Sequence, residues 1–191
     1  MPDYGAIVDH AIAAAPQFFA DAAGVFRFLE TTYGYRPHGQ HIDSMDFVPD
    51  AEIEMIYLWR RRKPSKGAVK IYWYLHPASV DVQFLLLNIP GVYRGAHDIV
   101  GSVFLHDLAA MRGHADDPDF LLPYDSRDSF TPTWRAVNKR VKIVQSNMCG
   151  VLEGLARATE RYAVDILRGD SAAFADAKRY YDEKRAARGG W

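Results

Sequence analysis

The sequence predicts an α+β fold in which an antiparallel meander of three or four strands packs against an N-terminal helix and a long C-terminal helical pair. Apolar residues recur at three- and four-residue steps near both ends of the chain, whereas residues 38–88 alternate with period two. The links between the expected strands are too short for parallel crossovers. At 191 residues, 49% of them hydrophobic, the chain has the size and composition of one domain, residues 1–191.

The N-terminal region, residues 1–34, is expected to be helical, either as one helix or as two helices that meet at Pro16. Before this proline a run of alanines has high helix propensity, and after it the apolar residues from Phe18 to Tyr33 keep helical spacing. Gly34 is placed to end the helix, and Pro37 prevents its continuation.

The region 38–88 carries the strand signature, which is an alternation rich in β-branched and aromatic residues. Residues His38–Val48 are expected to form either a loop or a short edge strand. Trp73 and Phe84 share their side of the alternation with apolar residues only, so this face is expected to pack on the helices. The three clear strands are Glu52–Arg61, Ala68–His76 and Ser79–Leu87.

Two segments separate the strands from the C-terminal helices. Residues 96–112 are expected to be helical, because apolar residues between Ile99 and Met111 fall on one side of a helix. Residues 113–133 are rich in Asp, Pro and Ser without a clear period, which predicts a long loop.

The helical pair spans residues 134–188, with Gly169 and Asp170 as the stop of one helix and the start of the next. Gly150 and Gly154 mark a bend or a close contact in the longer helix. The stripe on this helix is expected to be covered by the N-terminal helix, by a second copy of the chain in a homodimer, or by a different partner. It consists of Val137, Val141, Val144, Met148, Val151, Leu155, Ala158 and Tyr162.

One cluster has the composition of a metal site. His38, His41, Asp43 and Asp46 place two imidazoles and two carboxylates close together in the sequence, and these groups suit a divalent ion. A small metal-dependent hydrolase that uses them is therefore the alternative function. The helical His-Glu-x-x-His pattern is absent, so the leading expectation is a protein with no metal and no cofactor.

Other chemical motifs are weak. The pairs His97-Asp98 and His106-Asp107 are nine residues apart, which places them on opposite sides of the expected helix. Cys149 neighbours the apolar stripe and is expected to be a core thiol rather than a nucleophile. No phosphate-binding loop, dinucleotide motif or serine-hydrolase motif is present in the sequence.

Two charged clusters are the expected contacts with a partner protein, since charge speeds association and sets specificity. The first, at a predicted hairpin, comprises Arg60, Arg61, Arg62, Lys63 and Lys66. The second, in the long loop, comprises Asp116, Asp117, Asp119, Asp125 and Asp128. Solvated surface charge that protects turns and sheet edges is the simpler explanation of both clusters.

Composition restricts the partners and the compartment. The net charge of −1 does not favour nucleic acid or an anionic membrane as a partner. The single cysteine cannot form a disulfide within the chain, and the N-terminus lacks the pattern of a signal peptide. The apolar runs are too short to cross a bilayer. We therefore expect a cytoplasmic protein.

Two segments are similar to those of a loose group of small bacterial proteins of uncharacterised or presumed immunity function. They are Phe26-Arg27-Phe28-Leu29-Glu30 with Tyr33-Gly34-Tyr35-Arg36, and Ile166-Leu167-Arg168-Gly169-Asp170 with Phe174. The resemblance implies an N-terminal helix, a β-meander and a C-terminal helix pair, and it assigns no functional residue. Together with the missing catalytic motifs, it predicts a non-catalytic protein-binding protein, with neutralisation of a bacterial toxin as its most specific form.

Overall fold

The structure is a computed structural model, and it describes residues 4–45, 50–59, 66–74, 78–120 and 134–187. The fold is α+β, as predicted, with helices at both ends of a run of strands. The order is α1 (Tyr4–Val25), α2 (Arg27–Thr31), β1 (Tyr35–Met45), β2 (Asp50–Trp59), β3 (Gly67–Tyr74), β4 (Ser79–Leu87), the 3-10 turn η1 (Ala96–Asp98), β5 (Ile99–Phe104), α3 (Leu105–Met111), the 3-10 turn η2 (Pro118–Phe120), α4 (Trp134–Ser146), α5 (Met148–Tyr162), α6 (Val164–Leu167) and α7 (Ala172–Ala187).

The strands form one antiparallel sheet in sequence order, β1-β2-β3-β4-β5. The predicted meander is therefore confirmed and extended to five strands. Residues 35–45 form the edge strand β1 rather than a loop, with a register shift between Pro37 and Gly39.

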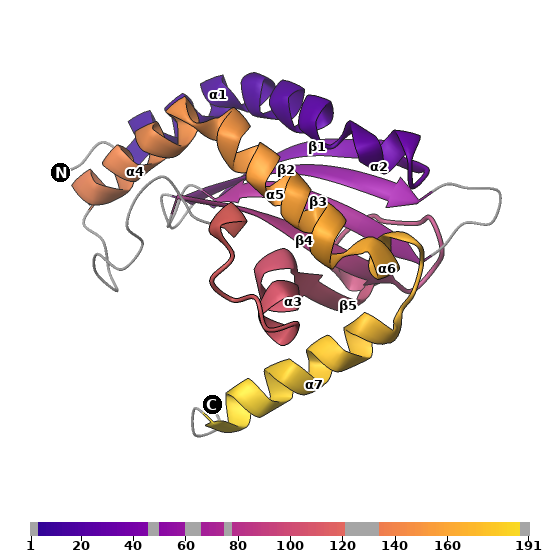
Figure 1. Cartoon of the computed structure of the whole chain (residues 1–191). Coiled ribbons are helices and arrows are strands. Elements are labelled where there is room, and N and C mark those ends of the chain that lie inside the picture. Colours follow the sequence, from indigo (N-terminus) through magenta and orange to yellow (C-terminus); the bar gives the residue numbers. More distant parts are fainter. Residues whose placement is uncertain (1–3, 46–49, 60–65, 75–77, 121–133, 188–191) are drawn as a thin grey trace.

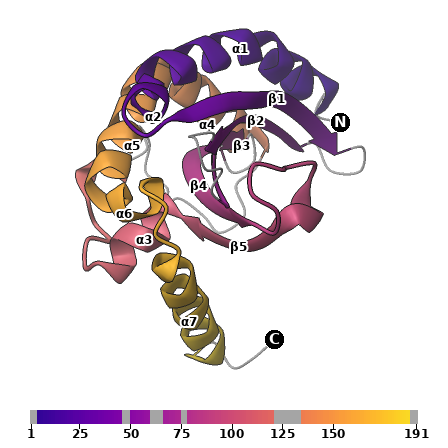
Figure 2. The ribbon, with the colours of Figure 1, turned by 90° about the vertical axis from the view of Figure 1, so that its right-hand side faces the viewer.

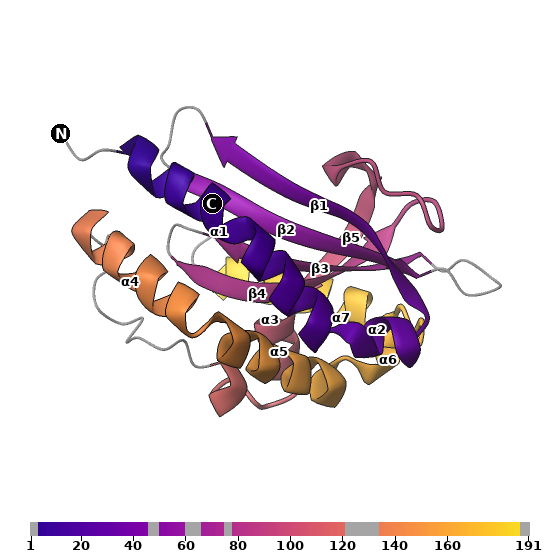
Figure 3. The same cartoon turned by 90° about the horizontal axis from the view of Figure 1, so that it is seen from above.

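Helices α1 and α5 lie side by side across one face of the sheet (Figures 1 and 3). Figure 2 shows the sheet curving beneath them, with α1, α2 and α5 along its outer side. Helices α3 and α7 pack at the β5 end. No helix in the described part of the chain is both long and apolar enough to cross a bilayer.

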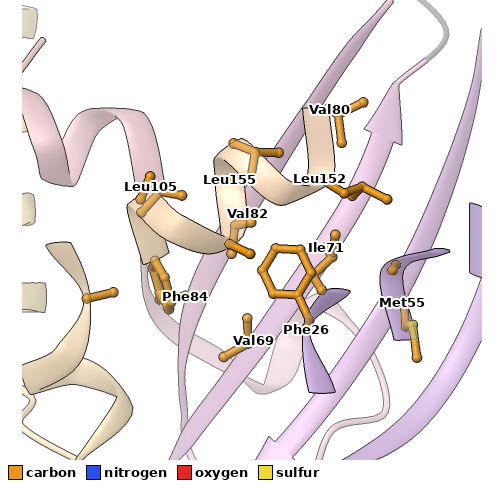
Figure 4. Packing of buried hydrophobic residues seen from close by; sticks show 14 of the residues in the cluster. Phe26, Met55, Val69, Ile71, Val80, Val82, Phe84, Leu105, Leu152 and Leu155 are labelled. Atoms are coloured by element: carbon orange, nitrogen blue, oxygen red, sulfur yellow. The ribbon is translucent and has the colours of Figure 1, made fainter. Parts of the chain in front are cut away.

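The main core lies between this sheet face and the helices (Figure 4). Trp73 and Phe84 are fully buried in it, which confirms the predicted face. The ring of Phe18 on α1 lies 6.2 Å from that of Trp73, so the N-terminal helix supplies part of the cover. Burial of aromatic rings of this size is a major source of folding free energy.

The opposite sheet face is mixed. Lys70 on β3 pairs there with two carboxylates of β2, at 3.0 Å from Glu52 and in a shorter contact with Glu54. A smaller apolar cluster continues along this face from Ile56 to Leu87. The sheet face opposite the main core therefore carries both ion pairs and apolar side chains, in keeping with the mixed residues at these positions in the sequence.

Of the two forms expected for the N-terminal region, the structure has the one without a break at Pro16: α1 runs through this exposed residue, because the buried Ala15 and Phe18 hold both halves on the sheet. One expected helix differs from the structure. Residues 96–112 are not one helix, since Ile99–Phe104 form the fifth strand. In so short an apolar run, helical and strand spacing are both satisfied, and pairing with β4 decides the outcome.

The long helix expected over residues 134–167 is divided at Asn147 and Ala163 into α4, α5 and α6. Its stripe is buried inside the chain's own core from Val141 to Tyr162, although Val151 is only partly buried. Helix α5 packs against α1, β4 and α3, so the chain itself covers the described part of the stripe. Gly154 marks a close contact, as expected, but with η2 rather than with another helix.

Candidate functional site

A groove of about 670 Å³ lies between β5 and α7, at the opposite end of the sheet from β1. Figure 1 shows α7 running beside β5 and α3 at this end. We call this feature the β5–α7 groove. It is lined by Leu86, Val100, Gly101, Ser102, Ser171, Phe174, Ala175, Lys178, Tyr181 and Asp182.

One side of the β5–α7 groove is a free strand edge. No strand pairs with the outer edge of β5 within the described ranges, and half of the backbone groups of an edge strand face away from the sheet. The register shift opposite Leu86 and Leu87 leaves Val100 as the extra residue of a bulge, and its side chain is 58% exposed.

Gly101 lies in the floor of the groove, between Leu86 of β4 and Phe174 of α7. A Cβ built on this residue would lie 3.6 Å from the Cβ atoms of both Leu86 and Phe174. An alanine would therefore make ordinary van der Waals contacts, whereas a larger side chain would project into the groove. The position has room for an alanine, and the glycine leaves no side chain between Leu86 and Phe174.

A polar cluster ties the groove wall to the rest of the fold, and we call it the His106 network. His106 Nδ1 lies 2.5 Å from Asp81 Oδ2, and His106 Nε2 lies 3.4 Å from Asp107 Oδ2. The same Asp107 oxygen accepts a hydrogen bond from the Tyr181 hydroxyl at 2.8 Å. Lys184 Nζ lies 3.2 Å from Asp107 Oδ1. The network thus joins β4, α3 and α7.

The electrostatics of this network favour a protonated imidazole. The hydrogen bond to Asp81 raises the pKa of His106, although burial opposes the shift, and the charges of Asp81 and Asp107 add to it. Burial raises the pKa of Asp81, although its bonds to His106 and to the Val82 backbone N–H oppose this. A protonated His106 donates from Nδ1 to Asp81 and places its positive charge near both carboxylates.

The predicted basic hairpin cannot be placed as a whole. Arg60, Arg61, Arg62 and Lys63 lie outside the described residues. Lys66 is described and is exposed, immediately before β3. A partner contact at this hairpin stays a prediction.

The predicted acidic loop is partly engaged inside the chain. Asp117 Oδ2 lies 2.5 Å from Arg161 Nη1 and also accepts a hydrogen bond from the Tyr162 hydroxyl. Asp119 receives Arg157 Nη2 at 2.8 Å and Arg161 Nη2 at 3.0 Å. These carboxylates fasten η2 to α5, a role that sequence reasoning did not predict.

The structure describes one of the three remaining acidic positions. Asp116 is exposed, whereas Asp125 and Asp128 lie outside the described residues. Contact between the acidic loop and a partner therefore stays a prediction, and Asp116 is the described residue available for it.

The candidate metal cluster is not assembled among the described residues. His38 Nε2 is 3.0 Å from the Tyr93 carbonyl oxygen, and His41 is exposed opposite Glu54 of β2. The side chain of Asp43 and all of Asp46 lie outside what the structure describes. Across the described ranges, no three His, Cys, Asp or Glu side chains are grouped so that they could hold a metal ion.

The prediction that Cys149 is a core thiol is wrong. It is exposed rather than buried in the core, and its Sγ lies 3.7 Å from Glu153 Oε1. Adjacent residues on a helix point about 100° apart, so the buried Met148 carries no implication for its neighbour.

Sequence reasoning missed the groove residues Val100, Gly101, Phe174 and Tyr181. The available signal was the β-branched character of Ile99–Phe104, which also fits a strand. The position of α7 beside that strand has no local signal in the sequence.

No family model, curated protein or solved structure matches this chain.

Proposed function

We propose that the protein binds another protein without catalysing a reaction, and that the β5–α7 groove receives an extended segment of the partner. The groove is the observation that carries this proposal, because it combines a free strand edge with an apolar floor. Extended peptides bind such edges by backbone hydrogen bonds, while pockets for alternate side chains give specificity. Neutralisation of a bacterial toxin is the most specific form of the proposal.

The groove chemistry favours a peptide segment. Val100 is an exposed apolar side chain on the strand edge, and Phe174 forms the apolar wall on α7. A partner strand beside β5 would pair with its outward backbone groups and place every second side chain toward Phe174. The basic hairpin at Arg60–Lys66 and Asp116 are proposed as outer contacts that speed association.

The binding surface can be tested with two matched substitutions. Val100→Arg places a long charged side chain in the groove, whereas Ile89→Arg makes the same change at an apolar residue that is 48% exposed and does not line the groove. Both variants should fold, since exposed substitutions usually change stability by about 0.5 kcal/mol or less. Affinity capture from bacterial lysate should recover a partner with wild type and Ile89→Arg but not with Val100→Arg. Equal recovery by all three would remove the groove from the proposal.

The toxin-binding form has its own test. Genes that neighbour this one are expressed in a bacterial host with and without the protein, and growth is measured. A neighbour that stops growth alone, and is tolerated with wild type and Ile89→Arg but not with Val100→Arg, is the expected result. Consumption of a small-molecule substrate by the purified protein would instead contradict a non-catalytic function.

A further inference from the structure

The wall of the β5–α7 groove is held by a residue that also belongs to the His106 network. Tyr181 lines the groove, and its hydroxyl donates a hydrogen bond to Asp107 Oδ2 at 2.8 Å. Lys184, one turn further along α7, reaches the other oxygen of Asp107 at 3.2 Å. The C-terminal half of α7 is therefore docked through one carboxylate, and His106 contacts that carboxylate.

We propose that the His106 network is a pH-dependent latch that sets how firmly α7 is held against β5. The effect of the latch on partner binding rests on the proposed function, but the latch itself does not. Its elements are Asp81 on β4, His106 and Asp107 on α3, and Tyr181 and Lys184 on α7. Tyr72 on β3 also faces Asp81 and Tyr181, and burial keeps it neutral by raising its pKa far above the usual range.

Protonated His106 compensates two carboxylates that otherwise face each other. With the proton present, Nδ1 donates to Asp81, and the positive ring lies with Nε2 3.4 Å from Asp107 Oδ2. When the proton leaves, Nδ1 keeps its hydrogen bond to Asp81, the positive charge of the ring is lost, and the Nε2 lone pair lies near Asp107 Oδ2. Lys184 is then the remaining cation of the network, so repulsion pushes Asp107, and the α7 residues bound to it, away from β4.

The direction of the pH effect follows from the raised pKa of His106. His106 has a raised pKa in the folded chain, so the folded state retains the proton better than the unfolded chain does. The stabilisation is full below the ordinary histidine pKa of about 6.5 and is lost as the pH rises through the folded pKa. We therefore expect α7 to be docked firmly at mildly acidic pH and to loosen at higher pH.

Hydrogen exchange of the α7 amides tests the latch without any partner. Exchange is measured across a pH series and corrected for the intrinsic pH dependence, for wild type, His106→Gln and His97→Gln. His97 is the matched control, because its side chain is 72% exposed and lies outside the network. Protection of α7 should fall several-fold with rising pH in wild type and His97→Gln, and should be independent of pH in His106→Gln. The same pH dependence in His106→Gln, or none in wild type, would overturn the proposal.

A second variant covers the case in which His106→Gln does not fold. Tyr181→Phe removes the α7 hydroxyl and leaves His106 and its two carboxylates in place. The imidazole, followed by NMR, should still titrate with a raised pKa, while α7 is weakly protected at all pH values. Protection in Tyr181→Phe that follows the wild-type profile would exclude the latch. Retained partner capture by Val100→Arg would refute the groove as a binding site and leave this result unchanged.

Discussion

The contact between α5 and η2 predicts opposite effects for two glycine substitutions on the same helix. A Cβ built on Gly154 would lie 2.8 Å from the Asp119 carbonyl oxygen, closer than real Cβ contacts allow. A Cβ built on Gly150 would meet nothing within 4 Å apart from its chain neighbours and the backbone of its own helix. Gly154→Ala is therefore the perturbation, and Gly150→Ala is its control.

Two opposing effects set the change in free energy of unfolding that each substitution causes. Alanine stabilises a helix by up to about 1 kcal/mol relative to glycine, and both substitutions gain from this. At Gly154 the new methyl group must displace η2, and such overpacking costs typically about 1–3 kcal/mol. Displacement is resisted because Arg157 and Arg161 bind the Asp119 carboxylate. We expect the two variants to differ by about 2 kcal/mol in free energy of unfolding, with Gly154→Ala the less stable.

Thermal and urea unfolding measure this difference directly. For a chain of 191 residues, about 2 kcal/mol corresponds to a separation of roughly 4–8 °C between the two midpoints. Gly154→Ala should also loosen η2, which increased hydrogen exchange at Asp119 would reveal. If Gly154→Ala stabilised the protein as much as Gly150→Ala, the close packing of η2 on α5 would be refuted.

Three further outcomes are expected. Trp73→Ala should lower the free energy of unfolding by about 3–5 kcal/mol, because the indole is fully buried, and an unchanged thermal midpoint would contradict the core assignment. The hydrogen bond from Tyr162, and then that from the Asp119 backbone N–H, hold the pKa of Asp117 below its usual range, so its stabilisation is present above about pH 3.9 and is lost on acidification. In acid titrations of stability, Asp117→Asn should therefore lose part of the acid dependence of wild type; an identical profile would argue against this role. Elemental analysis should find no stoichiometric metal, whereas about one ion per chain that disappears in a His38→Ala/His41→Ala variant would favour the hydrolase alternative.

The charged loops show why residue type alone did not define the site. The acidic cluster was predicted from composition, yet Asp117 and Asp119 are bound to Arg157 and Arg161, which lie about forty positions later in the chain. The composition of a segment shows that it is rich in carboxylates. It does not show which basic side chains from distant parts of the sequence will pair with those carboxylates in the fold.

Local chemistry by itself determined the strands of the meander, the buried face that contains Trp73 and Phe84, and the glycine stops at Gly34 and Gly169. Period-two alternation and the tolerance of glycine for positive φ act within a few residues, so they can be read from the sequence. The left-handed backbone at both glycines, with φ of 78° and 97°, agrees with this.

Tertiary structure decided that Ile99–Phe104 form a strand, that the long helix is divided, and that the β5–α7 groove forms. A six-residue apolar segment satisfies helical and strand spacing equally, and only the edge of β4 makes the strand the lower-energy choice. The groove and the His106 network join β4, β5, α3 and α7, and Asp81 and Lys184 of the network are 103 positions apart in the sequence. Their proximity results from packing α7 beside the last strand, and no pattern within either segment encodes that contact.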